Sequence, residues 1–186
     1  MSTFFEAPFK LKNHNYPNVE TYYEACKLFC LIHYSCSTLV QKARYAAAAK
    51  KIASDVMKKY RIPRKVVDEW KLREGAQAVY NATHAKFDQN PDLKKKLLDT
   101  GDKFIVQCYE KDSIFGSGCT ENELEDWFKK NNGKLIKIPI GVQIQSDKAI
   151  KVGNGRNLLG NFCMSIREEF RKMEEDMNSL QTLSLL

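Results

Sequence analysis

Apolar residues recur about every three to four positions along most of the chain, which is the spacing of amphipathic helices. The segment 38–60 holds four consecutive alanines and many strong helix formers, and Pro63 is placed to stop it. The final segment follows the glycine-rich turn "GNGRN" and has an apolar inner face of Leu158, Leu159, Phe162, Ile166 and Phe170. The pattern predicts helices over residues 19–34, 38–60, 64–87, 91–100 and 120–131, and from 158 onward.

Capping residues support two of these helices. Asn90 is an N-cap candidate, Pro91 suits the first helical position, and Gly101 stands just past the end. Thr120 and Glu123 have the spacing of a capping box. These signals predict the starts of two helices in the second half of the chain.

Strand-like patterns are short and few. Residues 4–12 alternate roughly and contain a proline, as in an edge strand, and "NHNYPN" over 13–18 predicts a turn. Residues 103–109, "KFIVQCY", predict a short buried strand, and 133–145 predict one or two strands interrupted by Pro139 and Gly141. With no internal repeat and no long linker, the chain is expected to form a single domain over 1–186, a mostly helical α+β fold with a small β-sheet.

Composition narrows the class of protein. Hydrophobic residues make up 43% and charged residues 28% of the chain, as in soluble globular proteins, and no apolar run is long enough for a membrane span. The first twelve residues lack the layout of a signal peptide, so an intracellular location is expected. The net charge of +7 favours a polyanionic partner, although the lysines look scattered rather than massed in one tract.

The six cysteines form neither a CxxC pair nor a zinc-finger spacing. Cys26, Cys30 and His33 follow a helical stripe that a metal could share, but buried small apolar residues explain the stripe better. We expect reduced cysteines, no metal and no cofactor.

The stretch "YPNVETYYEACKL" places Glu20 and Lys27 within about 20° of each other around a helix and about 10 Å apart along it. Tyr23 and Glu24 fill the same stripe. A solvated face would show the same pattern, with ion pairs contributing only tenths of a kcal/mol. Because the segment is aromatic and partly apolar, Lys27 could instead be partly buried and act as a nucleophile toward a carbonyl, with a carboxylate moving protons.

Three other places have both a functional and a structural interpretation. Asp112 could be a general base or bind ribose hydroxyls, or it could cap a turn before Gly116 and Gly118, which allow close approach of the backbone. Trp70 could stack on a base or belong to the core. "GNGRN" could present Arg156 and backbone amides to phosphates, but it matches neither a Walker loop nor a dinucleotide fingerprint.

Four segments together resemble the NADAR (YbiA-like) family. "YPNVETYYEACK" is similar to its Glu-His-x-aromatic-Gln-Ala-x-Lys signature, and "KFDQNPDLKKKLLDTG" follows its Lys-Phe-x-Gln-Asn-Pro and Leu-Leu-x-Thr-Gly order. "KDSIFGSG" resembles its Asp-x-x-Trp-Gly-x-Gly loop, and "GNGRNLLGNFCMSIR" its C-terminal motif. The chain departs from the pattern at Thr21 (usually His), Glu24 (usually Gln) and Phe115 (usually Trp). Thr3 lies near the slot of a usual Asn, and residues 119–152 look like an insertion.

The resemblance implies N-glycosidic chemistry on ribose-bearing substrates. It implies catalytic roles for Lys27, Glu20 and Asp112. It also implies substrate-binding roles for Tyr16, Tyr23, Trp70, Phe115, Gly116, Gly118, Arg156 and Asn157. The implied reaction removes ADP-ribose from guanine bases of nucleic acid. Lys27 would form a Schiff base with the aldehyde of the ring-opened ribose, and Glu20 would orient it and shuttle protons.

The implied partners are the ADP-ribose moiety and an ADP-ribosylated nucleic acid presenting a single-stranded or flipped guanine. No membrane and no obligate protein partner are expected. Two alternatives stay open: cleavage of phosphoribosylated pyrimidine intermediates of riboflavin biosynthesis, and a non-catalytic module that binds ADP-ribose or NAD.

Overall fold

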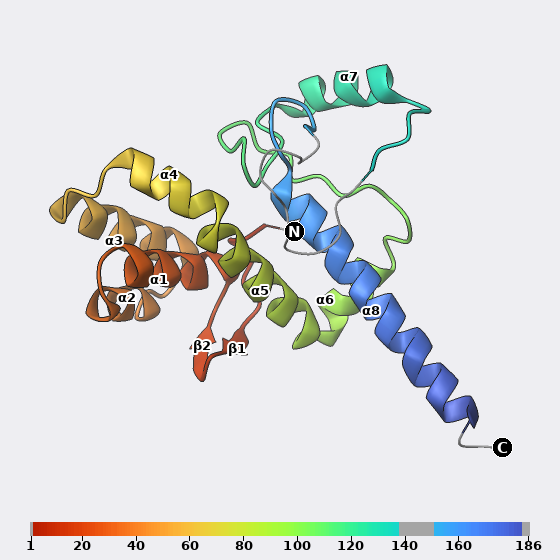
Figure 1. The fold of residues 1–186 in the computed structure, drawn as a ribbon, viewed down its shortest axis with the longest axis horizontal. Helices are drawn as coiled ribbons and strands as arrows, with labels where there is room; N and C mark the ends of the chain where they lie inside the picture. The colour runs from red at the N-terminus through yellow and green to blue at the C-terminus, as the bar shows by residue number, and fades with distance from the viewer. Residues whose placement is uncertain (1, 138–150, 184–186) are drawn as a thin grey trace. The chain divides into compact units, whose positions relative to one another are not determined.

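The computed structural model describes residues 2–137 and 151–183, with side chains to residue 181. In the described part, the regular structure is helical apart from a two-stranded antiparallel sheet, as the sequence predicts, and loops connect these elements (Figure 1). The chain divides into two compact units, residues 1–91 and 92–186. That the two units form a single domain over residues 1–186 stays a prediction.

The first unit is built around helix α1 (Val19–Leu31). The strands β1 (Phe9–Leu11) and β2 (His14–Tyr16) precede it as a hairpin in which Phe9 lies opposite Tyr16. Part of the predicted turn 13–18 is therefore a strand, because the reversal needs only Lys12 and Asn13, both at positive φ. The first unit also contains α2 (Tyr34–Gln41), α3 (Ala46–Lys59), α4 (Arg64–Leu72) and α5 (Glu74–Asp88).

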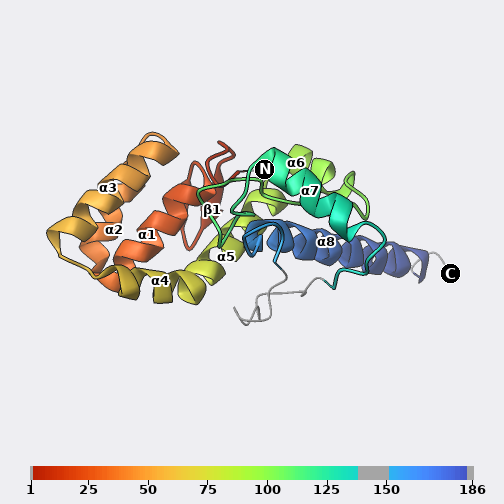
Figure 2. The same cartoon turned by 90° about the horizontal axis from the view of Figure 1, so that it is seen from above.

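Two long helices expected from the sequence are each broken. The segment 38–60 is divided at residues 42–45, so that α2 and α3 both pack against α1, as Figure 2 shows. The segment 64–87 is broken at Arg73, and a Cβ on Gly75 would lie 2.9 Å from a ring carbon of Trp70. In both cases packing on α1 or against Trp70 overrides a continuous helical propensity.

The second unit contains α6 (Pro91–Leu98), α7 (Glu121–Asn131) and α8 (Leu158–Leu183), with α6 beginning at the boundary between the units. Helix α6 starts at Pro91 and is followed by Gly101 at φ 55°, as predicted. The capping box of Thr120 and Glu123 is present at α7. The inner face predicted for α8 is buried at all five positions: Leu158, Leu159, Phe162, Ile166 and Phe170.

The strand predicted over 103–109 is wrong, because the backbone there is bonded by Ser117, by Asn157 and by side chains of α8 rather than by another strand. The Ile105 N–H donates to Met164 Sδ at 3.4 Å, and the Gln107 N–H donates to Asn157 Oδ1 at 2.8 Å. The prediction over 133–145 has no strand at 133–137, and its remainder lies outside the described residues.

Candidate active site

The N-terminus of α1 is fixed by a buried hydrogen-bond cluster. The Asn18 side chain accepts from both the backbone N–H and the hydroxyl of Thr21, each at 2.9 Å, and its amide donates to Glu6 at 3.0 Å. Thr21, which stands where the family pattern usually has histidine, is completely buried. By donating to the N-cap Asn18, Thr21 helps to stabilise the start of α1.

Glu20 lies in the first turn of α1 and is 7% exposed. One carboxylate oxygen accepts from the Thr3 hydroxyl at 2.9 Å, and the Glu20 backbone N–H donates to the Thr3 carbonyl at 3.1 Å. The other oxygen lies 3.8 Å from Lys50 Nζ on α3, whose side chain is 60% exposed. The carboxylate of Glu20 is thus held in place and reached by one solvent-exposed cation.

Lys27 lies two turns further along α1 and is mostly buried, with 13% of its side chain exposed. Its ammonium forms an ion pair with Glu24, whose side chain is 2% exposed, and lies 5.4 Å from the centre of the Tyr23 ring. The structure therefore pairs Lys27 with Glu24, whereas the sequence reasoning paired it with Glu20. A surface ion pair, the structural alternative for this stripe, does not describe so buried a pair.

Burial raises the pKa of the Glu24 carboxyl to about 6. The neighbouring Lys27 opposes the rise, Glu20 adds to it by charge repulsion, and Lys50 opposes it weakly. A carboxyl of this pKa exchanges its proton near neutral pH, which is the property that acid–base catalysis requires.

Trp70 is buried beneath the aromatic side of this cluster. Its ring centre lies 5.2 Å from that of Tyr23, and its indole N–H has no hydrogen-bond partner among the described residues. Tyr16 packs in the core against Phe9 and Tyr22, with a 3.4 Å hydrogen bond from Gln41 to its hydroxyl. Tyr23 thus lies beside Lys27 and Trp70 packs against Tyr23, while the binding roles predicted for Tyr16, Tyr23 and Trp70 stay predictions.

The remaining predicted residues lie in the second unit, around the turn 112–118. Asp112 Oδ1 accepts from the backbone N–H groups of Ile114 and Phe115 at 2.9 and 3.0 Å, so this carboxylate caps the turn. Gly116 has no room for a side chain, since a Cβ there would lie 2.8 Å from the Asp112 carbonyl oxygen. Gly118 has φ 61°. Phe115 is buried.

Asn157 and Arg156 differ in what their side chains contact. Asn157 is fully buried, and besides accepting from Gln107 its amide donates to the Ile105 carbonyl at 2.9 Å. Arg156 has one buried guanidinium nitrogen, Nη1, with no hydrogen-bond partner in the described part of the chain. Of the two, Arg156 has the free donor that an anionic ligand needs.

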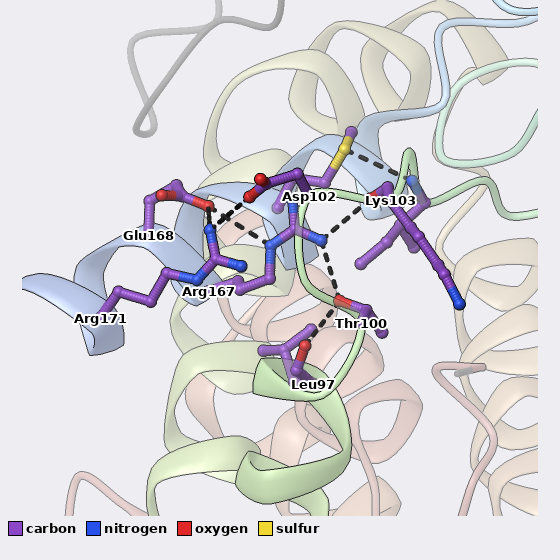
Figure 3. Close-up of polar contacts among 9 residues, drawn as sticks. Leu97, Thr100, Asp102, Lys103, Arg167, Glu168 and Arg171 are labelled. Atoms are coloured by element: carbon purple, nitrogen blue, oxygen red, sulfur yellow. Dashed lines mark hydrogen bonds and ion pairs between the residues drawn. The ribbon is translucent and has the colours of Figure 1, made fainter.

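Two of the motif segments meet at Arg167, which is 4% exposed. As Figure 3 shows, its guanidinium donates to the Thr100 hydroxyl at 2.8 Å and to the Lys103 carbonyl at 2.9 Å. Glu168 accepts from Arg167 at 3.3 Å and from Arg171 at 2.9 Å. The Thr-Gly and C-terminal Arg motifs therefore have a structural role, since together they fix α6 to α8.

A separate groove of about 260 Å³ borders α7 and the turn at Gly153. None of the predicted site residues lines it; its walls are Cys119, Glu123, Asp126, Trp127, Lys130, Gly153 and Asn154.

No group of three His, Cys, Asp or Glu side chains suited to a metal occurs within residues 2–137 and 151–183. Cys30 is exposed and Cys26 half-buried, so the expectation that the Cys26–Cys30–His33 stripe is buried is wrong. His33 instead caps α2, accepting from the Ser35 N–H at 3.2 Å. Across the described helices, none has the length and apolarity needed to span a membrane.

The sequence did not reveal two ion-pair partners in the candidate site: Glu24, which pairs with Lys27, and Lys50, which pairs with Glu20. Glu24 could have been found from its i, i+3 spacing to Lys27, since residues one turn apart are closer than residues two turns apart. Lys50 could not have been found in this way, because it comes from another helix.

A mostly buried lysine paired with a buried carboxyl, next to a second fixed carboxylate, defines a class of sites suited to nucleophilic and acid–base chemistry. Residues 1–171 match the NADAR domain, and the chain belongs to the NADAR domain family.

A viral protein and a bacterial structure are among the known proteins similar to the chain. "N-glycosidase R617" of Acanthamoeba polyphaga mimivirus is 37% identical over 91 residues, which are 49% of this chain and 41% of the viral protein. The match thus spans less than half of that relative's length. The NMR structure of the E. coli protein YbiA superimposes with a TM-score of 0.62 at 21% identity, covering 93% of this chain and 78% of YbiA. At that identity the likeness shows a YbiA-like fold.

Proposed function

We propose that the protein is an N-glycosidase that removes ADP-ribose from ADP-ribosylated guanine in nucleic acid, with Lys27 as the nucleophile. The observation that carries the proposal is the buried ion pair of Lys27 and Glu24 beside the fixed carboxylate of Glu20. Membership of the NADAR family and the name of the viral relative support N-glycosidic chemistry.

Lys27 must lose a proton before it can attack carbon. Glu24 is in contact with the ammonium and has a carboxyl whose pKa is raised to about 6, so it can accept this proton and later return it. Tyr23 lies beside the amine, and Trp70 supports Tyr23 from below, which restricts the positions that Lys27 can occupy.

The reaction begins on the ribose of the bound substrate. Opening of the ribose ring breaks C1′–O4′; the guanine nitrogen that carries the ribose forms a double bond to C1′ and its proton passes to O4′, which leaves C1′ at the oxidation level of an aldehyde. The neutral Lys27 amine adds to C1′ and the bond from C1′ to the guanine nitrogen breaks, leaving a protonated Schiff base on Lys27. The departing nitrogen takes one proton from the attacking amine and the proton held by Glu24. Water then hydrolyses the Lys27 Schiff base, releasing ADP-ribose and the free amine. One water is consumed for each N-glycosidic bond cleaved.

Glu20 has a different task in this scheme. Its oxygens are held by Thr3 and Lys50, so it serves as a fixed negative charge for the cationic intermediate on the ribose. Asp112 and Arg156 belong to the second unit, and their predicted parts in catalysis and binding remain predictions.

The test is to incubate the protein with a single-stranded oligonucleotide carrying ADP-ribosyl guanine and to follow free ADP-ribose by mass spectrometry. We expect release of ADP-ribose and restoration of unmodified guanine, with Lys27→Ala inactive and Lys10→Ala, an exposed lysine of the first unit, as active as the wild type. Release from a phosphoribosyl pyrimidine but not from the oligonucleotide would favour the metabolic alternative. ADP-ribose binding without turnover of either would overturn the enzymatic proposal.

A further inference from the structure

The positive charge of the protein is concentrated in one part of the first unit. Residues 42–73 contain eleven Lys and Arg and three Asp and Glu, a formal charge of +8. The whole chain has a charge of +7, so all the other residues together sum to −1. The lysines looked scattered in the sequence, but the excess of positive charge lies in α3, α4 and the residues that flank and connect them.

Ten of these eleven basic side chains are exposed, and most have no carboxylate beside them. Arg64 and Lys65 pair with Asp68 and Glu69 on their own helix. Within the described part of the chain, no ion pair engages the following seven exposed residues: Lys42, Arg44, Lys51, Lys58, Lys59, Arg61 and Arg73. An ordinary solvated face carries the two signs in similar numbers, whereas this segment has eleven basic and three acidic residues.

The basic surface is continuous with the candidate active site through Lys50. Its ammonium lies 3.8 Å from the Glu20 carboxylate and 5.4 Å from the ring centre of Phe4, which is 40% exposed. Lys51 and Lys58 follow within about 100° of Lys50 around α3, with Ser54 between them. From Lys50 to Lys58 the helix rises about 12 Å, which is roughly three stacked nucleotides at 3.4 Å each.

We propose that the basic side chains of α3 from Lys50 to Lys58 bind the phosphate backbone of a single-stranded nucleic acid on one side of the modified base. The inference rests on the proposed function for the identity of the polyanion. Unpaired lysines meet phosphates, and exposed rings at Phe4 and Tyr60 offer stacking surfaces for bases, which an acidic protein partner would not use. The surface selects a polymer over a free nucleotide.

The experiment measures binding of an unmodified, fluorescent single-stranded oligonucleotide by anisotropy over a series of salt concentrations. Each phosphate contact contributes about 0.7 to the slope of log K against log salt, so Lys51→Ala with Lys58→Ala should lower the slope by about 1.4. At 0.1 M salt this corresponds to about 25-fold weaker binding. The matched control is Lys103→Ala with Lys172→Ala, exposed lysines of the second unit, which should stay within about twofold of wild type.

Equal losses in the two double variants, no measurable binding by the wild type, or equally good competition by polyglutamate would each overturn the proposal. Thermal unfolding of both variants checks that the exposed substitutions leave the fold intact. Because binding of unmodified oligonucleotide needs no turnover, it tests the surface even if the enzymatic proposal fails. Conversely, release of ADP-ribose from a modified mononucleoside tests the chemistry without the surface.

Discussion

Glu24→Gln replaces the buried carboxyl beside Lys27 with a neutral amide of nearly the same shape. The substitution also restores the residue that the family pattern usually has at this position. It removes one ionisable group from α1 and leaves the aromatic contacts of Lys27 with Tyr23 unchanged. It therefore isolates the energetic effect of the buried charge.

The size of the effect follows from the pKa of Glu24. Folding raises this pKa from its usual 4.5 to about 6, so the folded protein holds the proton more tightly than the unfolded chain. The stability that the group contributes is fully present below pH 4.5 and is lost as the pH rises through 6. At 1.36 kcal/mol per pKa unit the total is about 2 kcal/mol, of which about 1.2 kcal/mol falls between pH 5.0 and 7.5.

Three charged groups act on Glu24: Lys27 and Glu20 of α1, and Lys50 of α3. Helix α2 also packs on α1, but it has no charged side chain. Urea unfolding of wild type and Glu24→Gln at pH 5.0 and 7.5 gives the free energy of unfolding of each. We expect the wild type to lose about 1.2 kcal/mol relative to the variant as the pH rises. A difference that is constant, or that grows in favour of wild type with pH, would refute the assignment of a buried, proton-exchanging carboxyl.

Three further results are expected. In the ADP-ribose release assay, the rate of the wild type should rise with pH through about 6, and Glu24→Gln should lack this inflection; an inflection retained in the variant would contradict the role of Glu24. Asn157→Ala should lower the free energy of unfolding by about 1–3 kcal/mol, because it removes the partner of two half-buried backbone groups; a loss no larger than that of exposed Asn154→Ala would contradict this. Trp70→Ala should cost about 3–5 kcal/mol, whereas Trp70→Phe should cost far less, since the indole N–H has no partner among the described residues; equal losses by thermal unfolding would show that this N–H matters.

The features that the sequence predicted well are those encoded locally. The capping box at Thr120 and Glu123 needs only residues of the same turn, and Pro91 and Gly101 act through their own backbone preferences. The inner face of α8 follows from spacing alone. These elements required no knowledge of distant contacts.

The features that were missed depend on residues far apart in the chain. The segment 103–109 looks like a strand, but its hydrogen-bonding groups are satisfied by Asn157 and Met164, some fifty residues later. The break at residues 42–45 reflects the packing of two helices on α1. No local pattern contains either contact.

The candidate site shows the same division. The spacing placed Glu20 and Lys27 on one helix and the resemblance named them as site residues; the structure bears out the placement. The pairing of their charges was not predictable, because Lys50 reaches Glu20 from α3 and burial decides that Lys27 meets Glu24. Packing between helices, rather than the motif, determines which carboxylate serves which lysine.

The central claim is that Lys27 forms a covalent bond with C1′ of the substrate. It is tested most directly by adding borohydride during turnover of ADP-ribosylated guanosine and locating the reduced adduct by peptide mass spectrometry. We expect an ADP-ribosyl group on the Lys27 peptide of the wild type, retained in Lys10→Ala and lost in Lys27→Ala. An active wild type with no adduct, or with the adduct on another lysine, would contradict it.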